Sequence, residues 1–283
     1  MPQAQTTNYE ALVTEARDGN KDSMSQLISK IRNRLYAISV KYLWHPHDAE
    51  DACQEILIRI VKNLHTFRGD SQFETWAHRI AINTLINIRK QASEPKLSFE
   101  DFSADLEDGL AEAPEDYQSR PDYHRMLEEI RTGCTSAMLQ CLEGDLRLSY
   151  IMGEILEFDH NEAATILEVQ VATYRKRLSR SRDKVNAFMQ GNCGLINPEN
   201  SCRCNRRVSK AIATKRLDPG NYIFSTSQES ADNFPIILEK IRNIKDMRSA
   251  ALLHQTSSTD GNKNAFSTWL KEELLSINTD EVS

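Results

Sequence analysis

A run of basic residues late in the chain has the composition of a nucleic-acid contact. Between Arg175 and Lys184 there are six basic residues and a single acid, Asp183. Arginine can neutralise phosphates or grip a guanine edge with two hydrogen bonds, and each bidentate pair gives about 1–3 kcal/mol of base discrimination. The polar side chains expected to project from this stretch are Thr173, Arg175, Lys176, Arg177, Ser179 and Arg180.

The sequence around this basic run predicts a helix-turn-helix. Asp159 can cap a first helix, and Glu162, three residues later, completes a capping box. After a break at residues 168–170, a second helix carries an apolar stripe on the side away from the basic row, made of Val171, Tyr174, Leu178, Val185 and Phe188. Two helices joined by a tight turn, the second strongly basic, favour DNA binding over the solvated face of an ordinary bundle.

A second candidate surface lies at the start of a helix near residue 72. Its residues are Asp70, Ser71, Gln72, Phe73, Trp76, Arg79, Asn83 and Lys90. Aromatic rings, amides and basic groups suit single-stranded bases, which can stack and expose their pairing edges. The alternative is that Phe73 and Trp76 belong to the core, and their spacing alone favours that interpretation.

Three cysteines follow the basic helix in a C-x8-C-x-C pattern, at Cys193, Cys202 and Cys204. In a chain expected to be cytoplasmic, this density of thiols indicates a metal site or a redox switch more than a structural disulfide. Zinc or copper(I) would suit sulfur ligands, although no cofactor is certain and the thiols can equally remain unligated. No fourth ligand is evident nearby, and His254 is an arbitrary candidate. The other cysteines, Cys53, Cys134 and Cys141, are expected in the core.

Composition indicates an all-α protein. The 283 residues include only 10 glycines and 8 prolines, and long stretches carry good helix formers. No apolar run approaches the ~20 residues of a membrane span, and the N-terminus lacks the features of a secretory signal, so we expect a cytoplasmic protein without membrane insertion. The net charge of −6 hides a strong segregation. Residues 94–116 hold nine acids and one lysine, whereas residues 203–216 hold six basic residues and no acid.

The predicted fold is two small helical domains joined by an acidic linker, followed by a C-terminal helical extension. In the first domain, helices are expected at 9–16 and 22–44, then from a cap at Asp48, then from about residue 72. A single helix is expected over 146–157, and the extension carries two more at 235–253 and 265–275. The linker is expected to be disordered or ordered only against a partner. The segments are 8–91, the linker 92–120, the second domain 121–190, a cysteine loop 191–204 and the extension 205–283.

Two segments resemble the extracytoplasmic-function (ECF) sigma factors. That family has an acidic start, a Gln-Glu pair and the pattern F-x-G-x-S-x-F-x-T-W-x-x-x-I-A-x-N in its region 2. The matching residues are Asp48, Asp51, Gln54, Glu55, Phe67, Gly69, Phe73, Thr75, Trp76, Ile80, Ala81 and Asn83. Residues 148–185 are similar to region 4, although the family has glycine where Glu168 stands and serine or threonine where Gln170 stands. The two regions would span 22–91 and 124–190.

The resemblance implies roles for these residues. A face made of Asp48, Asp51, Gln54, Glu55 and Arg59 would dock on core RNA polymerase, whose β′ clamp helices and β flap are the implied partners. The loop at residues 70–73, with Trp76, would capture a base flipped out of the −10 promoter element, and Arg79, Asn83 and Lys90 would hold the opened strand. The −35 element would be read by Thr173, Tyr174, Arg175, Lys176, Arg177 and Arg180. The acidic linker would follow positively charged polymerase channels.

The resemblance therefore implies a sigma factor that directs transcription initiation, with control by metal or redox state through the cysteine tail as a hypothesis. The extension would replace or supplement an anti-sigma factor. A stand-alone helix-turn-helix regulator is the alternative, but it leaves the aromatic loop and the acidic linker without a role. An enzyme is not expected, because the chain has no phosphate-binding glycine loop and no recognisable hydrolase motif.

Overall fold

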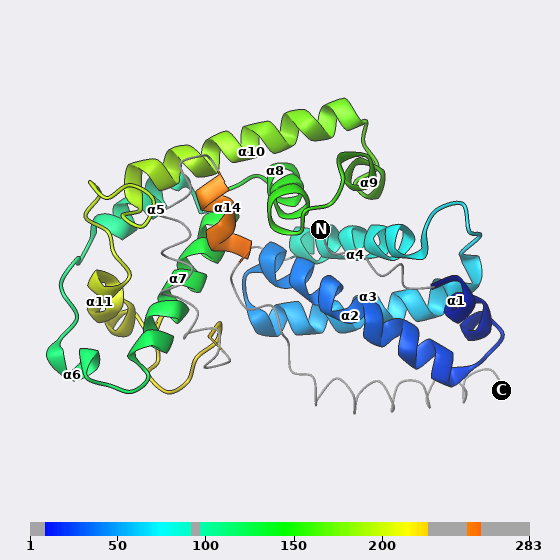
Figure 1. Cartoon of the computed structure of the whole chain (residues 1–283), viewed down its shortest axis with the longest axis horizontal. Coiled ribbons are helices and arrows are strands. Elements are labelled where there is room, and N and C mark those ends of the chain that lie inside the picture. The colour runs from blue at the N-terminus through cyan, green and yellow to red at the C-terminus, as the bar shows by residue number, and fades with distance from the viewer. Residues whose placement is uncertain (1–8, 92–96, 226–247, 256–283) are drawn as a thin grey trace. The chain divides into compact units, whose positions relative to one another are not determined.

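The computed structural model describes residues 9–91, 97–225 and 248–255. These residues are helices and connecting loops, and within them the only β-type pairing is an isolated bridge between Cys193 and Cys202. The all-α prediction is therefore confirmed for the described part of the chain. The chain divides into two compact units, the first containing residues 9–91 and the second containing residues 97–225 and 248–255 (Figure 1).

The first unit is a bundle of helices that follow one another closely in sequence. Its elements are α1 (Tyr9–Arg17), α2 (Lys21–Leu43), α3 (Pro46–Asn63), the 3-10 turn η1 (Leu64–Thr66) and α4 (Phe73–Gln91). Apolar residues at spacings of three and four give α3 and α4 one buried face each, whereas α2 is buried on every side from Leu35 to Leu43. The three helices meet in a core that includes Leu27, Ile31, Leu35, Ile56, Ile60, Ala81 and Leu85. Sequence periodicity is enough to assemble this unit.

Local sequence signals, a cap and a proline, explain two of the helix starts in the first unit. The Asn20 side chain accepts hydrogen bonds from the backbone N–H groups of Asp22 (3.0 Å) and Ser23 (3.1 Å), so it caps α2. The prediction that Asp48 caps the third helix is wrong. That helix begins two residues earlier at Pro46, whose fixed φ and missing N–H suit the first helical position.

The second unit has a longer list of elements and draws on distant parts of the chain. They are α5 (Phe99–Glu107), α6 (Glu115–Gln118), α7 (Tyr123–Gln140), α8 (Gly144–Tyr150), the π-helical segment η2 (Ile151–Ile155), α9 (His160–Ile166), α10 (Val171–Asn192), η3 (Asn205–Arg207), α11 (Val208–Ala213) and α14 (Arg248–Gln255). The single helix expected over 146–157 is thus α8 followed by a π-helical turn, and Glu157 lies beyond it at φ 53°.

The acidic stretch, predicted to be a linker that is disordered or ordered only against a partner, contains a helix. Residues 99–107 form α5, which is capped by Ser98, whose hydroxyl accepts a hydrogen bond from the Asp101 N–H at 3.0 Å. Phe102 and Leu106 of α5 are buried within the second unit. This stretch packs against its own chain, and Asp105, Asp108 and Glu112 form ion pairs with basic residues of the extension.

The extension after residue 204 completes the core of the second unit. Val208, Ala211 and Leu217 form a buried cluster with Ala113 and Met126. Further along, α14 covers the last part of the helix expected at 235–253 and buries Leu253. The rest of that helix and the helix expected at 265–275 lie outside the described residues.

Candidate nucleic-acid interface

The helix-turn-helix is formed by α9 and α10. Asp159 caps α9 as predicted, since its carboxylate accepts hydrogen bonds from the N–H groups of Asn161 (2.8 Å) and Glu162 (3.4 Å). The turn between the helices places Glu168 at φ 54°, in the left-handed region that favours glycine. At the start of α10, Gln170 makes no side-chain cap. Both departures from the family pattern thus fall at backbone positions where the family's usual residue would fit better.

Helix α10 has one buried face and one basic, exposed face. Tyr174, Leu178 and Val185 are buried in the unit's core. The exposed side chains of its first three turns include Thr173, Arg175, Lys176 and Arg180. This segregation puts positive charge where phosphates and base edges could reach it.

Tyr174 does not belong to this exposed face. It is 0% exposed, and its ring lies edge-on to His160 with the centroids 5.7 Å apart. Its place in the predicted −35 set is corrected: the fourth residue of α10 lies on the same face as Leu178, so it packs in the core and supports the helix from behind.

Three of the arginines of α10 already have neighbours within the second unit. Arg177 pairs with Asp145 at 2.5 Å, and Arg182 pairs with Glu154 at 2.6 Å. Arg175 donates a hydrogen bond from Nε to His160 Nδ1 at 3.3 Å. Because the Arg177 pair is partly exposed, it contributes little to stability and can be exchanged for a phosphate at small cost.

The second candidate surface lies in the first unit, at the loop before α4. Phe67, Phe73 and Trp76 form an aromatic cluster with ring centroids 5.4–5.9 Å apart, and the Tyr9 ring lies 5.6 Å from that of Phe73. Phe73 is only 4% exposed, so it holds the loop together and is not available to a base. The alternative that this residue is core is the one the structure supports, whereas Trp76 is half-buried at the edge of the cluster.

The polar residues predicted around this cluster divide by exposure. Asp70, Gln72, Asn83 and Lys90 are exposed, while Ser71 and Arg79 are half-buried. Gly69, at φ 82°, lets the loop turn before α4. Asn83 and Lys90 are seven residues apart on α4, which places them on one side of the helix, two turns from each other.

The residues predicted to dock on polymerase lie along α3. Asp48, Asp51 and Arg59 are exposed, and Gln54 and Glu55 are half-buried. The Arg59 guanidinium pairs with the Glu55 carboxylate one turn away, with Nε 3.0 Å from Oε1. The five side chains therefore share a polar face opposite the buried Ile56 and Ile60.

The cysteine loop is held by its backbone. The backbones of Cys193 and Cys202 form an isolated parallel β-bridge, and the Gly194 N–H donates a hydrogen bond to the Cys202 carbonyl oxygen at 3.0 Å. The two thiols are free. Burial raises the pKa of the Cys202 thiol to about 11 and raises that of Cys193 as well. In the described residues, no group of three or more His, Cys, Asp or Glu side chains is arranged to hold a metal ion. The three thiols do not form a ready-made ligand shell.

Sequence reasoning missed a fourth cysteine near this loop. Cys134 of α7 was expected only in the core, but its thiol has the three loop cysteines as electrostatic neighbours, and burial raises its pKa well above the ordinary range. Nothing in the local sequence signals this, because Cys134 precedes Cys193 by 59 residues. The arbitrary candidate His254 is engaged elsewhere: it is buried, with Nε2 3.1 Å from the Thr135 carbonyl oxygen.

Comparison with known proteins identifies the class. The sigma-70 region 2 family matches residues 27–94. The chain is 29% identical over 181 residues to the RNA polymerase sigma-H factor of Pseudomonas aeruginosa, covering 63% of this chain and 92% of that protein. It is 28% identical over 186 residues to the ECF RNA polymerase sigma-E factor of Escherichia coli, covering 64% of this chain and 94% of that protein.

Among solved structures, the chain is similar to CnrH, determined in complex with the cytosolic domain of CnrY, at 20% identity and a TM-score of 0.45, covering 64% of this chain and 96% of that one. The chain contains a sigma-70 region 2 at residues 27–94 and is similar to RNA polymerase sigma factors, including ECF sigma-E factors, over almost the whole length of those proteins. The two relatives are covered almost completely, while each match leaves more than a third of this chain uncovered. None of the described helices is long and apolar enough to span a membrane.

Proposed function

We propose that this protein directs core RNA polymerase to promoters by reading a −35 element with α10 and by capturing opened −10 DNA with α4 and the loop before it. The observation that carries the proposal is the exposed basic row of α10, in a chain that also contains a sigma-70 region 2. Sigma factors act by binding, so no catalytic step is part of the proposal.

The −35 contact would come from the first turns of α10. In helix-turn-helix proteins the N-terminal residues of the second helix reach the base edges. Thr173, Arg175, Lys176 and Arg180 are exposed there, and Arg177 would join them on leaving Asp145. Tyr174, which is buried, would hold α10 against the core of the second unit and would not contact bases.

The −10 contact would come from the first unit. Asp70 and Gln72 stand exposed on the loop that the Phe67–Phe73–Trp76 cluster supports, and Asn83 and Lys90 continue along α4. Trp76, at the edge of the cluster, offers a ring on which an unpaired base could stack. The polar face of α3 would bind the β′ clamp helices of the polymerase, and the second unit would bind the β flap.

The test is transcription start-site mapping in vitro with the full chain, core RNA polymerase and fragmented genomic DNA. We expect starts that require the chain and share two spaced upstream elements. Arg175→Ala combined with Arg180→Ala should reduce these starts at least tenfold, since each bidentate or phosphate contact gives about 1–3 kcal/mol. Lys184→Ala is the matched control, because Lys184 lies farther along the same helix and is also exposed.

Binding of DNA without polymerase separates the two classes of function. A sigma factor should bind promoter DNA well only with polymerase, whereas a stand-alone regulator should retain an operator by itself. If no chain-dependent start appears and the chain alone retains specific duplex DNA, the regulator is the better description.

A separate hypothesis is that metal or redox state controls the protein through Cys193, Cys202 and Cys204. Cys134 joins this set because it lies near the three loop cysteines. Binding of zinc or copper(I) would require the thiol side chains to turn toward one another, because they do not converge as they lie. Competition with a chromophoric chelator tests it: the wild-type chain should withdraw zinc or copper(I), and Cys193→Ser with Cys202→Ser should not. Cys53→Ser, a buried thiol of the first unit, is the control. An anti-sigma partner likewise remains a prediction of the family resemblance.

A further inference from the structure

The extension packs on α7 through a buried apolar cluster, which also includes Ala113. Val208 is 0% exposed and Leu217 2% exposed, and both belong to the cluster that contains Met126 of α7. Burial of two such apolar side chains stabilises the contact. The extension is therefore fixed on this surface and does not hang from the end of α10.

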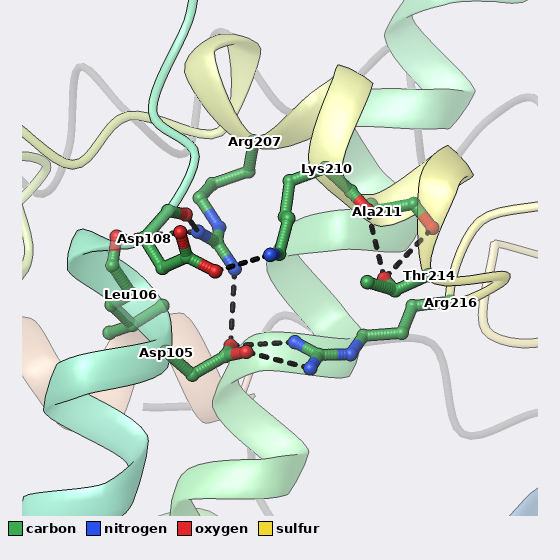
Figure 2. A network of polar contacts seen from close by, with 8 residues as sticks. All are labelled: Asp105, Leu106, Asp108, Arg207, Lys210, Ala211, Thr214 and Arg216. Carbon is green, nitrogen blue, oxygen red and sulfur yellow. Dashed lines mark hydrogen bonds and ion pairs between the residues drawn. The ribbon is translucent and has the colours of Figure 1, made fainter.

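A network of ion pairs joins the extension to the C-terminal end of α5 (Figure 2). The Arg207 guanidinium, which is 6% exposed, donates to the carbonyl oxygens of Leu106 (3.3 Å) and Asp108 (2.7 Å) and to the Asp105 carboxylate (3.1 Å). A cation at this position satisfies the last carbonyls of a helix and complements its dipole. Arg207 thus acts as a C-terminal cap for α5, supplied from about a hundred residues away.

Arg216 adds a bidentate pair to the same carboxylate. Its two terminal nitrogens lie 2.6 and 2.7 Å from the two oxygens of Asp105. Lys210 pairs with Asp108 beside it. Figure 2 shows these side chains converging from α11 and the residues that follow it onto Asp105 and Asp108. Parallel N–H···O bonds of this kind fix orientation as well as distance.

On another face, α5 packs against the second half of α10. The Phe102 ring stacks on Phe188 with the centroids 5.4 Å apart, and Phe99 contacts the same ring at 5.2 Å. Ser103 Oγ also donates to the Asn192 side-chain oxygen. The short helix α5 is therefore clamped between the extension and α10.

A second part of the extension reaches the middle of α10. Gln255 of α14 donates to the Glu154 carbonyl oxygen at 2.6 Å, and the Glu154 carboxylate pairs with Arg182 of α10. The Leu253 carbonyl accepts a hydrogen bond from the buried Arg131 of α7 at 2.7 Å. Residues 205–217 thus support α10 through α5, and residues 251–255 support it through Glu154, which pairs with Arg182.

We propose that the extension braces the DNA-reading helix, and that Asp105 and Arg216 are positioning residues that hold α10 through α5. The inference rests on the proposed −35 recognition by α10. A helix of 22 residues is about 33 Å long. A small tilt at its braced C-terminal half therefore displaces the arginines at its other end by a distance that matters to a bidentate contact. The two residues touch no DNA and act through Phe102 and Phe188.

The experiment uses the full chain with core RNA polymerase on two templates, a mapped promoter and the same promoter with its −35 element substituted. The variants are Asp105→Asn, Arg216→Gln and the double variant, with Asp105→Glu and Arg216→Lys as conservative changes. Glu107→Gln on the same helix is the matched control, because Glu107 is exposed. Thermal unfolding of each variant is measured alongside.

We expect each single variant to lower starts from the intact promoter by roughly threefold or more, and to leave starts from the substituted promoter unchanged. The double variant should equal Asp105→Asn, since the contact between Asp105 and Arg216 is already lost in that single variant. Arg216→Gln leaves the pair between Asp105 and Arg207 in place and should have the smaller effect of the two single variants. Asp105→Glu should recover most of the activity. Arg216→Lys should recover little, because an ammonium cannot make the bidentate contact. Glu107→Gln should behave as wild type on both templates.

Three results would overturn the brace. Wild-type activity of the single variants on both templates would mean that α10 does not depend on the pair. An equal fall on both templates would show a loss of folded protein or polymerase binding. A rise on the intact promoter would instead make the extension an inhibitory contact. Should the wild-type chain itself give no polymerase-dependent start, the proposed function fails, which is distinct from a failure of the brace alone.

Discussion

The two units of this protein are both helical, but different interactions hold them together. In the first unit, helices adjacent in sequence meet through apolar faces such as those of Ile31, Ile56 and Leu85. In the second unit, segments about a hundred residues apart meet through buried charges, of which Arg131 and Arg207 are examples. Arg32 and Lys41 are buried in the first unit as well, but the helices of that unit are neighbours in sequence, whereas the second unit uses buried arginines to join distant segments.

The largest expected effect comes from removing a buried charge in the second unit. Arg131 and Glu128 are each 1% exposed and form an ion pair, and Arg131 also binds the Leu253 carbonyl. Arg131→Met should destabilise the second unit by about 3–5 kcal/mol, because the Glu128 carboxylate stays buried after losing the guanidinium that balances its charge. Hydrogen exchange followed by mass spectrometry should show the loss in peptides from 97–225 and not in those from 9–91.

The exposed pair of the first unit is the matched control for this variant. Arg59→Met breaks the pair with Glu55, whose side chains are 47% and 44% exposed, and should cost less than about 1 kcal/mol. Combining Arg131→Met with Glu128→Leu should recover part of the loss, since both charges are then absent. Equal losses for Arg131→Met and Arg59→Met would remove the contrast between the units.

The first unit has one ionisable group that should respond strongly to acid. Burial, with a smaller contribution from Arg34, lowers the pKa of His78 from 6.5 to about 4. The unfolded chain therefore binds the proton first, so this histidine's contribution to stability is full above pH 6.5 and is lost as the pH falls toward 4. The loss amounts to roughly 3 kcal/mol once both states are protonated.

The role of His78 is tested by measuring the free energy of unfolding of the first unit between pH 7 and pH 5. Few carboxylates titrate in this pH range. His78→Gln should flatten the dependence in that window. The exposed His65, changed to Gln, is the control and should leave the slope as it is. An unaltered slope in the His78 variant would assign the acid sensitivity to other groups.

An intermediate effect is expected where α8 and η2 approach α10. A Cβ added at Gly153 would lie 2.6 Å from the Tyr174 hydroxyl oxygen and 2.8 Å from both terminal carbons of Leu178. Gly153→Ala should therefore destabilise the second unit by about 1–3 kcal/mol through overpacking. Because Tyr174 and Leu178 support the basic row, −35-dependent starts should fall with stability.

Gly191→Ala, in the same unit, is the control, because nothing lies within 4 Å of the added carbon. It should be neutral or slightly stabilising, since alanine is the better helix former. In the first unit, Gly19 also has open space around it, and its φ of 90° is what an alanine would strain. A harmless Gly153→Ala would show that the helices of the second unit can move apart.

The smallest effects concern helix caps, and they should have opposite signs in the two units. Asn20→Ala removes the cap of α2 and should lower the stability of the first unit by about 1 kcal/mol. Gln170→Ser supplies a cap that α10 lacks and should raise the stability of the second unit by a similar or smaller amount. Chemical denaturation of each variant, followed by hydrogen exchange, tests both. A Gln170→Ser variant no more stable than the wild type would show that α10 is held by its packing alone.

Much of the first unit and of the helix-turn-helix could be predicted from the sequence. Periodic apolar residues, the turn at Gly19 and the cap at Asp159 are local signals, and each predicted helix there lies within a few residues of an observed one. The exposed basic row of α10 followed from the same periodicity. Tyr174 is the exception among the residues predicted to contact the −35 element. The family resemblance assigns it to the DNA contact, whereas its spacing of four residues from Leu178 already places it on the buried face.

The contacts between distant segments could not be predicted. The sequence shows an acidic stretch and a basic stretch, but charge segregation alone does not say whether they meet or face separate partners. Only the tertiary structure decided that Asp105 binds Arg207 and Arg216, that Cys134 lies near the cysteine loop and that His254 is enclosed by Tyr150 and Thr135. The physical reason is range: helix periodicity and caps act over a few residues, whereas these contacts join residues about 60 to 120 positions apart and exist only in the packed tertiary structure.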